Sequence, residues 1–243
     1  MRKLAILVTA LAFAPAAFAA GGGGTASWQQ WHAGNELGDR ASLQRGARNF
    51  INYCAGCHSL KYVRYQRIGT DLAISDEVLK ENLLLPGAKI TDYVLTSMPE
   101  ALANEWFGIV PPDLSLITRS KGSDYVFQFL KTFYVDPNAA TGTNNLALAG
   151  TAMPHVLSDL QGLQRAVFDE HGAFVGFEAA GAPGQLSPAA YDAFVRDTVN
   201  FLEYAGEPAK LHRATIGVWV VLFLLLFTAL AWLLKQEYWK DVH

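Results

Sequence analysis

Hydrophobic residues recur with a helical period in two stretches of the first half of the chain. The first stretch can be capped by Asp39 or Ser42, and its apolar side chains fall at i, i+4, i+7, i+8 and i+11: Leu43, Ala47, Phe50, Ile51 and Cys54. The second starts at Ser123 and has apolar side chains at Tyr125, Val126, Phe129, Leu130 and Phe133. Both patterns predict amphipathic helices, and the first places Cys54 at the end of its buried stripe.

A third helical pattern has clear signals at both ends. Ser187 can act as the N-cap, and Pro188 suits the first helical position. Gly206 stands beyond the predicted end, and Pro208 follows it. The apolar stripe of this helix consists of Tyr191, Val195, Thr198 and Leu202. Only a few residues separate this helix from the apolar segment that follows, so the folded domain is expected close to that segment.

Strand-like alternation does not extend far anywhere, and no internal repeat is visible. Two segments rich in Pro, Gly and Asn, Pro99–Ser120 and Asp136–Ser158, are predicted to be long loops. Long loops in a compact domain commonly surround a functional site. The sequence therefore predicts a mainly α fold: a single domain of about 190 residues with long loops that wrap its site.

The N-terminus has the features of an export signal. Arg2 and Lys3 precede an apolar run, Leu4–Phe13, that is too short to span a bilayer, and Ala17-Phe18-Ala19 supplies small residues for signal peptidase. We predict that residues 1–19 are cleaved and that the rest of the chain is exported.

The C-terminal segment Thr215–Leu234 predicts one transmembrane helix. It contains no charged residue, and twenty helical residues reach roughly 30 Å, the thickness of a hydrocarbon core. Aromatic residues that suit the membrane interface lie near and just beyond its ends: Trp219, Trp232, Tyr238 and Trp239. We predict an exported domain at 20–210, an anchor at 211–236 and a tail at 237–243. The cleaved signal places the domain on the periplasmic side of a bacterial inner membrane and the tail inside.

Charge is unevenly distributed along the chain. The whole chain has 19 basic and 22 acidic residues, and loss of Arg2 and Lys3 leaves 17 minus 22, or −5. The stretch from Asp159 to Glu207 contains eight acidic residues and only two basic ones, Arg165 and Arg196. Such a surface could attract a basic protein, or it could serve only to keep the domain soluble. We expect no nucleic-acid partner.

Cys54-Ala55-Gly56-Cys57-His58 is the motif that carries chemistry. Two thiols three positions apart can add to the vinyl groups of a porphyrin, and the adjacent histidine can become an axial ligand of the iron. These are the only cysteines among the 243 residues. A zinc site would need a second cluster of ligands, which is missing from the sequence, and a redox dithiol would not need the histidine. The motif therefore predicts one covalently attached haem c, with His58 as an iron ligand.

The sixth iron ligand is left open by the residues alone. Met98 and Met153 are the methionines that remain after signal cleavage, and each precedes a proline. The loop before Met153 is freer to fold across the haem, which favours Met153 modestly. His155 lies two residues further on and could compete, and the other histidines are His32, His171, His212 and His243.

Several motifs together resemble cytochrome c1, the haem subunit of the cytochrome bc1 complex (complex III). Besides the early Cys-x-x-Cys-His motif they are Pro111-Pro112-Asp113-Leu114-Ser115 with Arg119 four residues on, Asp124-Tyr125-Val126-Phe127, a late Met153-Pro154, and Phe201-Leu202-Glu203-Tyr204-Ala205-Gly206-Glu207-Pro208 before one C-terminal span. The resemblance covers essentially the whole mature chain. One departure is that Gln161–Leu186 has no second acidic run like those described in some members of the family.

The resemblance implies roles for individual residues. His58 and Met153 would be the axial ligands, and Pro111 and Pro112 would lie against the haem. Arg119 would contact a haem propionate, because its planar donor fork suits a carboxylate. Tyr125 would be a second donor to the haem.

The resemblance also implies a function, which is one-electron transfer from the Rieske iron–sulfur protein to a soluble cytochrome c. The chain would not be an enzyme on its own but an electron-transfer subunit of a quinol–cytochrome c oxidoreductase, packed against cytochrome b and membrane lipid in a dimeric complex. Two alternatives are a membrane-tethered cytochrome that serves another oxidase or reductase and a haem sensor with an open sixth position. Binding of carbon monoxide would distinguish the sensor from an electron carrier.

Overall fold

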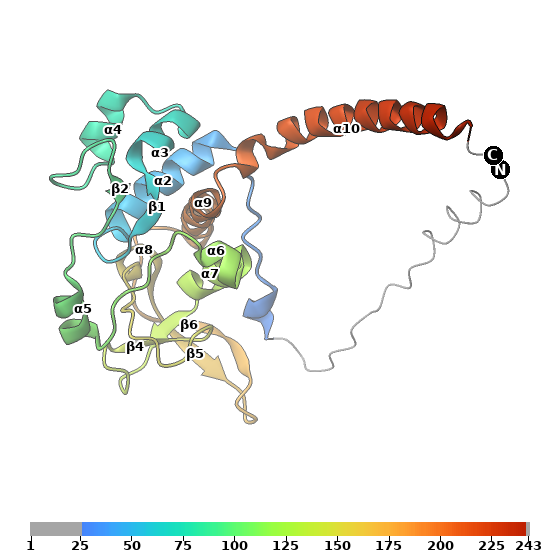
Figure 1. Cartoon of the computed structure of the whole chain (residues 1–243). Coiled ribbons are helices and arrows are strands. Elements are labelled where there is room, and N and C mark those ends of the chain that lie inside the picture. The colour runs from blue at the N-terminus through green and yellow to red at the C-terminus, as the bar shows by residue number, and fades with distance from the viewer. Residues whose placement is uncertain (1–25, 242–243) are drawn as a thin grey trace.

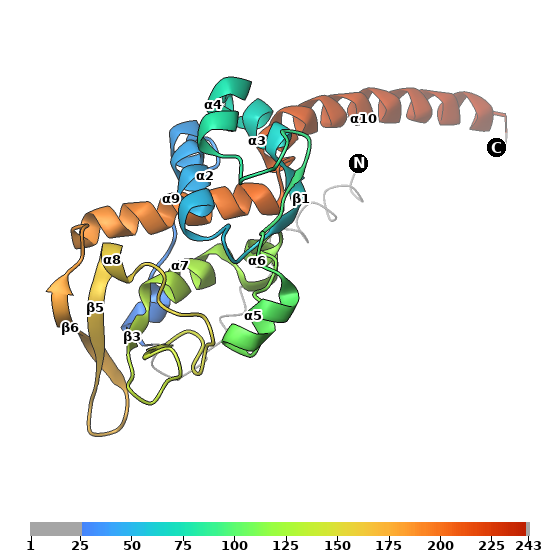
Figure 2. The same cartoon turned by 90° about the vertical axis from the view of Figure 1, so that its left-hand side faces the viewer.

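A computed structural model describes residues 26–241 of the chain, and the predicted signal peptide lies outside the described residues. The centre of the domain is the crossing of α2 (Arg40–Tyr53) and α9 (Pro188–Gly206). Helices α2, α3 (Tyr65–Leu72) and α4 (Asp76–Asn82) lie on one side of α9 (Figure 2). Helices α6 (Ile117–Lys121) and α7 (Ser123–Lys131) lie on the other side with the longest hairpin, so the fold is mainly helical as predicted.

Helix α2 begins where the sequence predicted. The side chain of Asp39 accepts a hydrogen bond from the amide of Ser42 at 3.0 Å, so Asp39 is the N-cap and Ser42 lies inside the helix. Leu43, Ala47 and Phe50 are buried as expected.

The close crossing of α2 and α9 depends on a residue that the apolar pattern did not reveal. A Cβ atom on Gly46 would lie 2.6 Å from the Cβ of Phe201 and 2.8 Å from the carbonyl carbon of Asp197. The missing side chain therefore lets the two backbones meet. Beside this point Arg45 donates two hydrogen bonds to Asp197, at 2.5 and 3.0 Å, and the rings of Phe50 and Phe201 pack 5.9 Å apart.

The other two predicted helices are present with different ends. In α9 the hydroxyl of Ser187 caps the amide of Ala190, as predicted, but Gly206 is the last helical residue and does not lie beyond the helix. In α7 the N-cap is Gly122, and Ser123 is the first helical residue. Phe133 was assigned to that helix by its spacing, but it lies in strand β3 (Phe133–Val135), which pairs with β4 (Thr143–Asn145).

The prediction of a long loop over Pro99–Ser120 is wrong. This segment contains α5 (Glu100–Phe107) and most of α6. Two of the residues that suggested a loop are helix caps: Pro99 is the N-cap of α5, and Gly108 ends it with a φ of 70°. Pro111 and Pro112 do lie in irregular backbone. The second predicted loop, Asp136–Ser158, is irregular apart from β4 and the first residue of α8 (Ser158–Gln161).

A β-hairpin that the sequence analysis missed projects from the domain (Figures 1 and 2). Strand β5 (Gly162–Phe168) pairs antiparallel with β6 (Phe174–Pro183), and the register shifts twice along the pair. These irregularities interrupt the alternation of apolar and polar residues that would have revealed the strands. A second small sheet joins β1 (Leu60–Arg64) to β2 (Tyr93–Val94), and the described chain begins with the 3-10 helix η1 (Ser27–Gln30).

Helix α10 (Lys210–Trp239) extends away from the domain (Figure 1). It is long and apolar enough to cross a membrane, which confirms the expected C-terminal membrane helix. Only Glu207–Ala209 separates it from α9, and two ion pairs bridge this short connection: Lys210 with Glu203, and Arg213 with Glu207. The carboxylate of Glu203 also accepts hydrogen bonds from Asn35 and Ser123, so the start of α10 is tied to three parts of the domain.

Candidate haem-binding site

The Cys-x-x-Cys-His motif forms a tight turn at the end of α2. The amide of Cys54 continues the helix by donating to Phe50, and the amides of Cys57 and His58 both donate to the carbonyl of Cys54, at 3.0 and 2.9 Å. Both cysteines are free thiols and are partly buried. Burial raises the pKa of Cys54 to about 12 and also raises the pKa of Cys57. A redox dithiol needs a lowered pKa, so this pair does not have the properties of one.

The imidazole of His58 is oriented by a backbone carbonyl. Its Nδ1 donates to the carbonyl of Pro112 at 2.7 Å, which leaves Nε2 free to bind a metal. Iron-ligating histidines are commonly fixed in this way through their second nitrogen. Burial lowers the pKa of His58, although Pro112 and Asp113 oppose the shift. The ring is therefore neutral at pH 7, as a ligand must be.

Residues that follow the motif are fastened to the Pro111–Ser115 segment. The side chain of Asp113 accepts a hydrogen bond from the amide of Lys61 at 2.8 Å and another from the amide of Ser115 at 3.0 Å. The amide of Leu114 donates to the carbonyl of Ser59 at 2.9 Å. Asp113 thus holds the carbonyl of Pro112 in place beside His58. Sequence reasoning gave Asp113 no role, although Asp side chains commonly accept a hydrogen bond from the backbone amide two residues on, as Asp113 does from Ser115.

The other predicted site residues are spread around this centre. Pro111 is half-buried and Pro112 is exposed. Arg119 is exposed near the end of α6, beside Gly206 of α9, and its guanidinium has no partner among the described residues. Tyr125 is half-buried on α7, where its ring stacks on Phe129. The contacts of the structure bring His58 and Pro112 together, but they do not join Arg119 or Tyr125 to them.

The two candidate methionines are held in different environments. Met153 is partly buried and packs against the hydrophobic core. Met98 is also partly buried, but its amide bonds to the hydroxyl of Thr96, which in turn donates to the carbonyl of Gly56 within the haem motif. The segment of Met98 is therefore fastened to the loop that carries His58, whereas Met153 comes from a separate part of the chain.

His155, the competing candidate, is 7% exposed. Its ring lies flat on that of Phe133, with centroids 4.9 Å apart and 3° between the planes. Burial lowers the pKa of His155 to about 4, and the amide of Gln161 opposes this shift only in part. The imidazole is thus neutral in the folded protein at pH 7.

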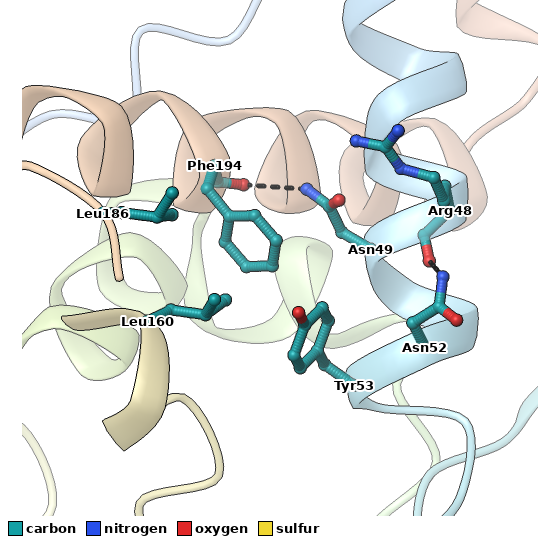
Figure 3. A pocket seen from close by; sticks show the side chains of 7 residues that line it. All are labelled: Arg48, Asn49, Asn52, Tyr53, Leu160, Leu186 and Phe194. Atoms are coloured by element: carbon teal, nitrogen blue, oxygen red, sulfur yellow. Dashed lines mark hydrogen bonds between the residues drawn. The ribbon is translucent and has the colours of Figure 1, made fainter. Parts of the chain in front are cut away.

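A cleft of about 510 Å³ lies between α2 and α9, next to the haem motif. Tyr53, Leu160, Leu186 and Phe194 point toward one another across it, and Asn49 donates to the carbonyl of Phe194 (Figure 3). None of the predicted haem-binding residues lines this cleft, which is a gap between packed helices beside the site.

The donor set fits a c-type haem better than a bare metal ion. Residues 26–241 contain no group of three or more His, Cys, Asp or Glu side chains placed to hold a metal. The two thiols and the oriented His58 instead supply two covalent links and one axial ligand.

The sequence matches the Cytochrome C1 family over residues 30–162 and 182–242. The chain belongs to the cytochrome c1 family. It is 48% identical over 254 residues to cytochrome c1 of Allochromatium vinosum, with full coverage of both chains. It is also 42% identical to the ammonia monooxygenase gamma subunit of Nitrosomonas europaea, over 84% of this chain and 85% of that one. A solved chain of a hyperthermophilic respiratory complex III covers 90% of this chain and 81% of its own length, with a TM-score of 0.41 and 18% identity.

Membership of this family confirms the resemblance seen in the sequence. It makes the chain a cytochrome c1 of a bc1 complex, with a role in electron transfer, and it implies a c-type haem. The cysteines of a Cys-x-x-Cys motif, Cys54 and Cys57, are present in the chain. The stretch between the two matched parts, residues 163–181, falls within the β5–β6 hairpin. The hairpin that sequence reasoning missed is thus also a stretch that the family match does not cover.

Proposed function

We propose that the chain relays single electrons from the Rieske iron–sulfur protein to a soluble cytochrome c, within a quinol–cytochrome c oxidoreductase. A covalently bound haem c supplies the chemistry, since its iron alternates between the ferric and ferrous states. The observation that carries the proposal is the 2.7 Å hydrogen bond from Nδ1 of His58 to Pro112, beside two free thiols. It fixes a neutral imidazole with Nε2 available to the iron.

In this proposal the protein side chains bind the haem, orient it and shield it from water, and they transfer no proton. Cys54 and Cys57 hold the haem through thioether bonds, and Pro111 and Pro112 cover it with apolar surface. Arg119 and Tyr125 donate to the haem propionates. Their support is that the Arg119 guanidinium and the Tyr125 hydroxyl have no hydrogen-bond partner among residues 26–241, so both remain available to a carboxylate.

Met153 is the proposed sixth ligand. Met153 packs against the core from a segment that is not fastened to the haem motif, so its sulfur would be available to hold the iron. Met98 is tied through Thr96 to the haem motif itself. A thioether ligand stabilises the ferrous state and raises the potential, as an electron carrier that accepts from an iron–sulfur protein requires.

The anchor determines where this relay operates. We infer that α10 spans a bacterial inner membrane, packs against cytochrome b and lipid, and leaves the haem domain on the periplasmic side. The short connection at Glu207–Ala209 and its ion pairs keep the domain near the membrane surface. The whole is expected to function within a dimeric complex.

An optical and redox titration of the purified full-length protein, with and without carbon monoxide, tests the proposal. We expect a low-spin haem of positive potential that shows the weak absorption band of a methionine–iron bond and does not react with carbon monoxide. Met153→Leu should abolish the band and lower the potential, whereas the matched variant Met98→Leu should leave both unchanged. A high-spin haem that binds carbon monoxide would refute the electron relay and favour a sensor.

Purification from membranes tests the partners separately. Cytochrome b and the Rieske protein should co-purify with the tagged chain. Recovery of a different oxidase or reductase, with the same haem spectrum, would retain the electron-transfer chemistry and reject the bc1 assignment of its partners.

A further inference from the structure

Four aromatic rings form a continuous series from α7 to the segment that carries Met153. Tyr125 and Phe129, one helical turn apart, stack with centroids 6.4 Å apart. Phe129 meets Phe133 edge to face at 5.1 Å, and Phe133 lies flat against His155 at 4.9 Å. Such contacts favour one relative arrangement of the rings.

The middle of this series is fixed firmly to the fold. Phe133 is 1% exposed in β3, where it pairs with Asn145 of β4. The side chain of Asn145 donates to the carbonyl of Phe129 at 2.7 Å and receives a hydrogen bond from Thr132. Phe133 therefore presents a ring that cannot easily move.

The contact of the His155 ring that the structure defines most clearly is this stack. The Nε2 atom of this ring is buried and has no hydrogen-bond partner within 3.5 Å among the described residues, and the same is true of Oε1 of Gln161. The backbone of His155 accepts a hydrogen bond from the amide of Ser158, where α8 starts. The flat contact with Phe133 is thus a side-chain restraint on the Met153 segment, in addition to the packing of Met153 and Leu157 in the core.

The segment has room to shift if that restraint is lost. A cavity of about 340 Å³ borders Pro154 and His155, and Thr141 and Thr143 also line it. Removing the ring would enlarge this space.

We propose that His155 is a positioning residue for Met153: its stack on Phe133 holds the Met153 segment so that the sulfur stays on the iron. This inference rests on the proposed role of Met153 as sixth ligand. It assigns to His155 a role as a flat ring that braces the ligand and does not itself bind iron.

The experiment compares full-length holoprotein variants by the methionine–iron absorption band, the fraction of ferrous haem that binds carbon monoxide, and the midpoint potential. His155→Leu removes the ring, and His155→Phe keeps a flat ring but no nitrogen. His171→Leu, at the exposed turn of the β5–β6 hairpin, is the matched control. Covalent haem content, measured after denaturation, verifies that each variant has matured.

We expect His155→Leu to weaken the band, lower the potential and raise the fraction with sulfur off the iron about two- to tenfold, the effect of losing one ring stack. His155→Phe and His171→Leu should resemble the wild type. Phe133→Leu should reproduce the effect of His155→Leu, and the double variant should add little, because both remove the same contact.

Two results would overturn the inference while leaving the proposed function intact. One is wild-type behaviour of both His155→Leu and Phe133→Leu. The other is an equal loss in His155→Leu and His155→Phe, which would show that a nitrogen and not the stack matters. Failure of the proposed function has a different signature, because the wild type would lack the band or Met153→Leu would retain it.

Discussion

Replacing Gly46 with alanine tests whether the α2–α9 crossing sets the stability of the domain. An added Cβ would lie 2.6 Å from the Cβ of Phe201 and closer still to the backbone oxygen of Asp197. Real Cβ atoms essentially never come closer than 3.0 Å to another heavy atom, and the oxygen of Asp197 would lie at 2.0 Å, so the helices must separate by roughly 1 Å. Backbone atoms form part of the obstacle, and a rotamer change cannot relieve the clash.

The size of the expected loss in stability follows from the side chains packed between the two helices. Leu43, Phe50, Phe201 and Leu202 are each no more than 2% exposed, and burial of such side chains contributes about 2 kcal/mol each. A gap of 0.5–1 Å forfeits roughly a quarter to a half of the packing energy, or about 2–4 kcal/mol for the four. The higher helix propensity of alanine offsets about 1 kcal/mol of this loss. The net loss is about 2 kcal/mol, which lowers Tm by about 4–8 °C.

The assay is thermal unfolding of the full-length holoprotein, followed by circular dichroism at one fixed scan rate. Gly38→Ala is the control, because a Cβ there meets nothing within 4 Å. It should change stability by less than about 0.5 kcal/mol. An unchanged or raised Tm for Gly46→Ala would refute the reasoning, since helix propensity would then outweigh the supposed clash.

Two more predictions concern buried polar contacts of α9. Tyr204→Phe removes the hydroxyl that donates to Asp71 at 3.0 Å, and it should lower the free energy of unfolding by about 1–2 kcal/mol, measured by denaturant titration. Glu203→Gln weakens the tie to Lys210 and should cost about 1 kcal/mol at pH 7. Burial opposes ionisation of Glu203, but Lys210 and two neutral donors prevail and hold its pKa below 4.5. The contribution of Glu203 is therefore full above pH 4.5 and is lost as pH falls through the lowered pKa. Stability measured against pH should fall more steeply below pH 4.5 in the wild type than in Glu203→Gln, and parallel curves would contradict this assignment.

The helices that the sequence predicted well are those whose signals are local. Asp39 and Ser187 cap the helices expected of them, because an N-cap bonds an amide only three residues away. The apolar run before the C-terminus predicted α10 for the same reason, since length and hydropathy are properties of one segment.

Sequence reasoning failed where the same residue types serve different structures. Pro99 and Gly108 indicated a loop, yet they cap the short helix α5. The β5–β6 hairpin escaped notice because register shifts interrupt its alternation, and strand pairing is decided by a partner some distance along the chain.

The candidate haem site also combines features that the local sequence encodes with features that only distant contacts decide. The Cys54–His58 motif and its likeness to the cytochrome c1 family could be recognised from residue types and spacing alone. Three contacts of the site join residues that are 22 to 54 positions apart in the sequence. They are the hydrogen bond of His58 to Pro112, the hydrogen bond of Lys61 to Asp113, and the stack of His155 on Phe133. No local pattern encodes these pairs.

The sequence by itself determined the family, the haem motif, the anchor and the principal helices, because each depends on neighbouring residues or on one continuous segment. The tertiary structure alone decided which glycine permits the helix crossing, which carbonyl orients His58 and which ring lies against His155. These features arise when distant segments compete for the same space and the same hydrogen-bond partners, and folding of the whole domain settles that competition.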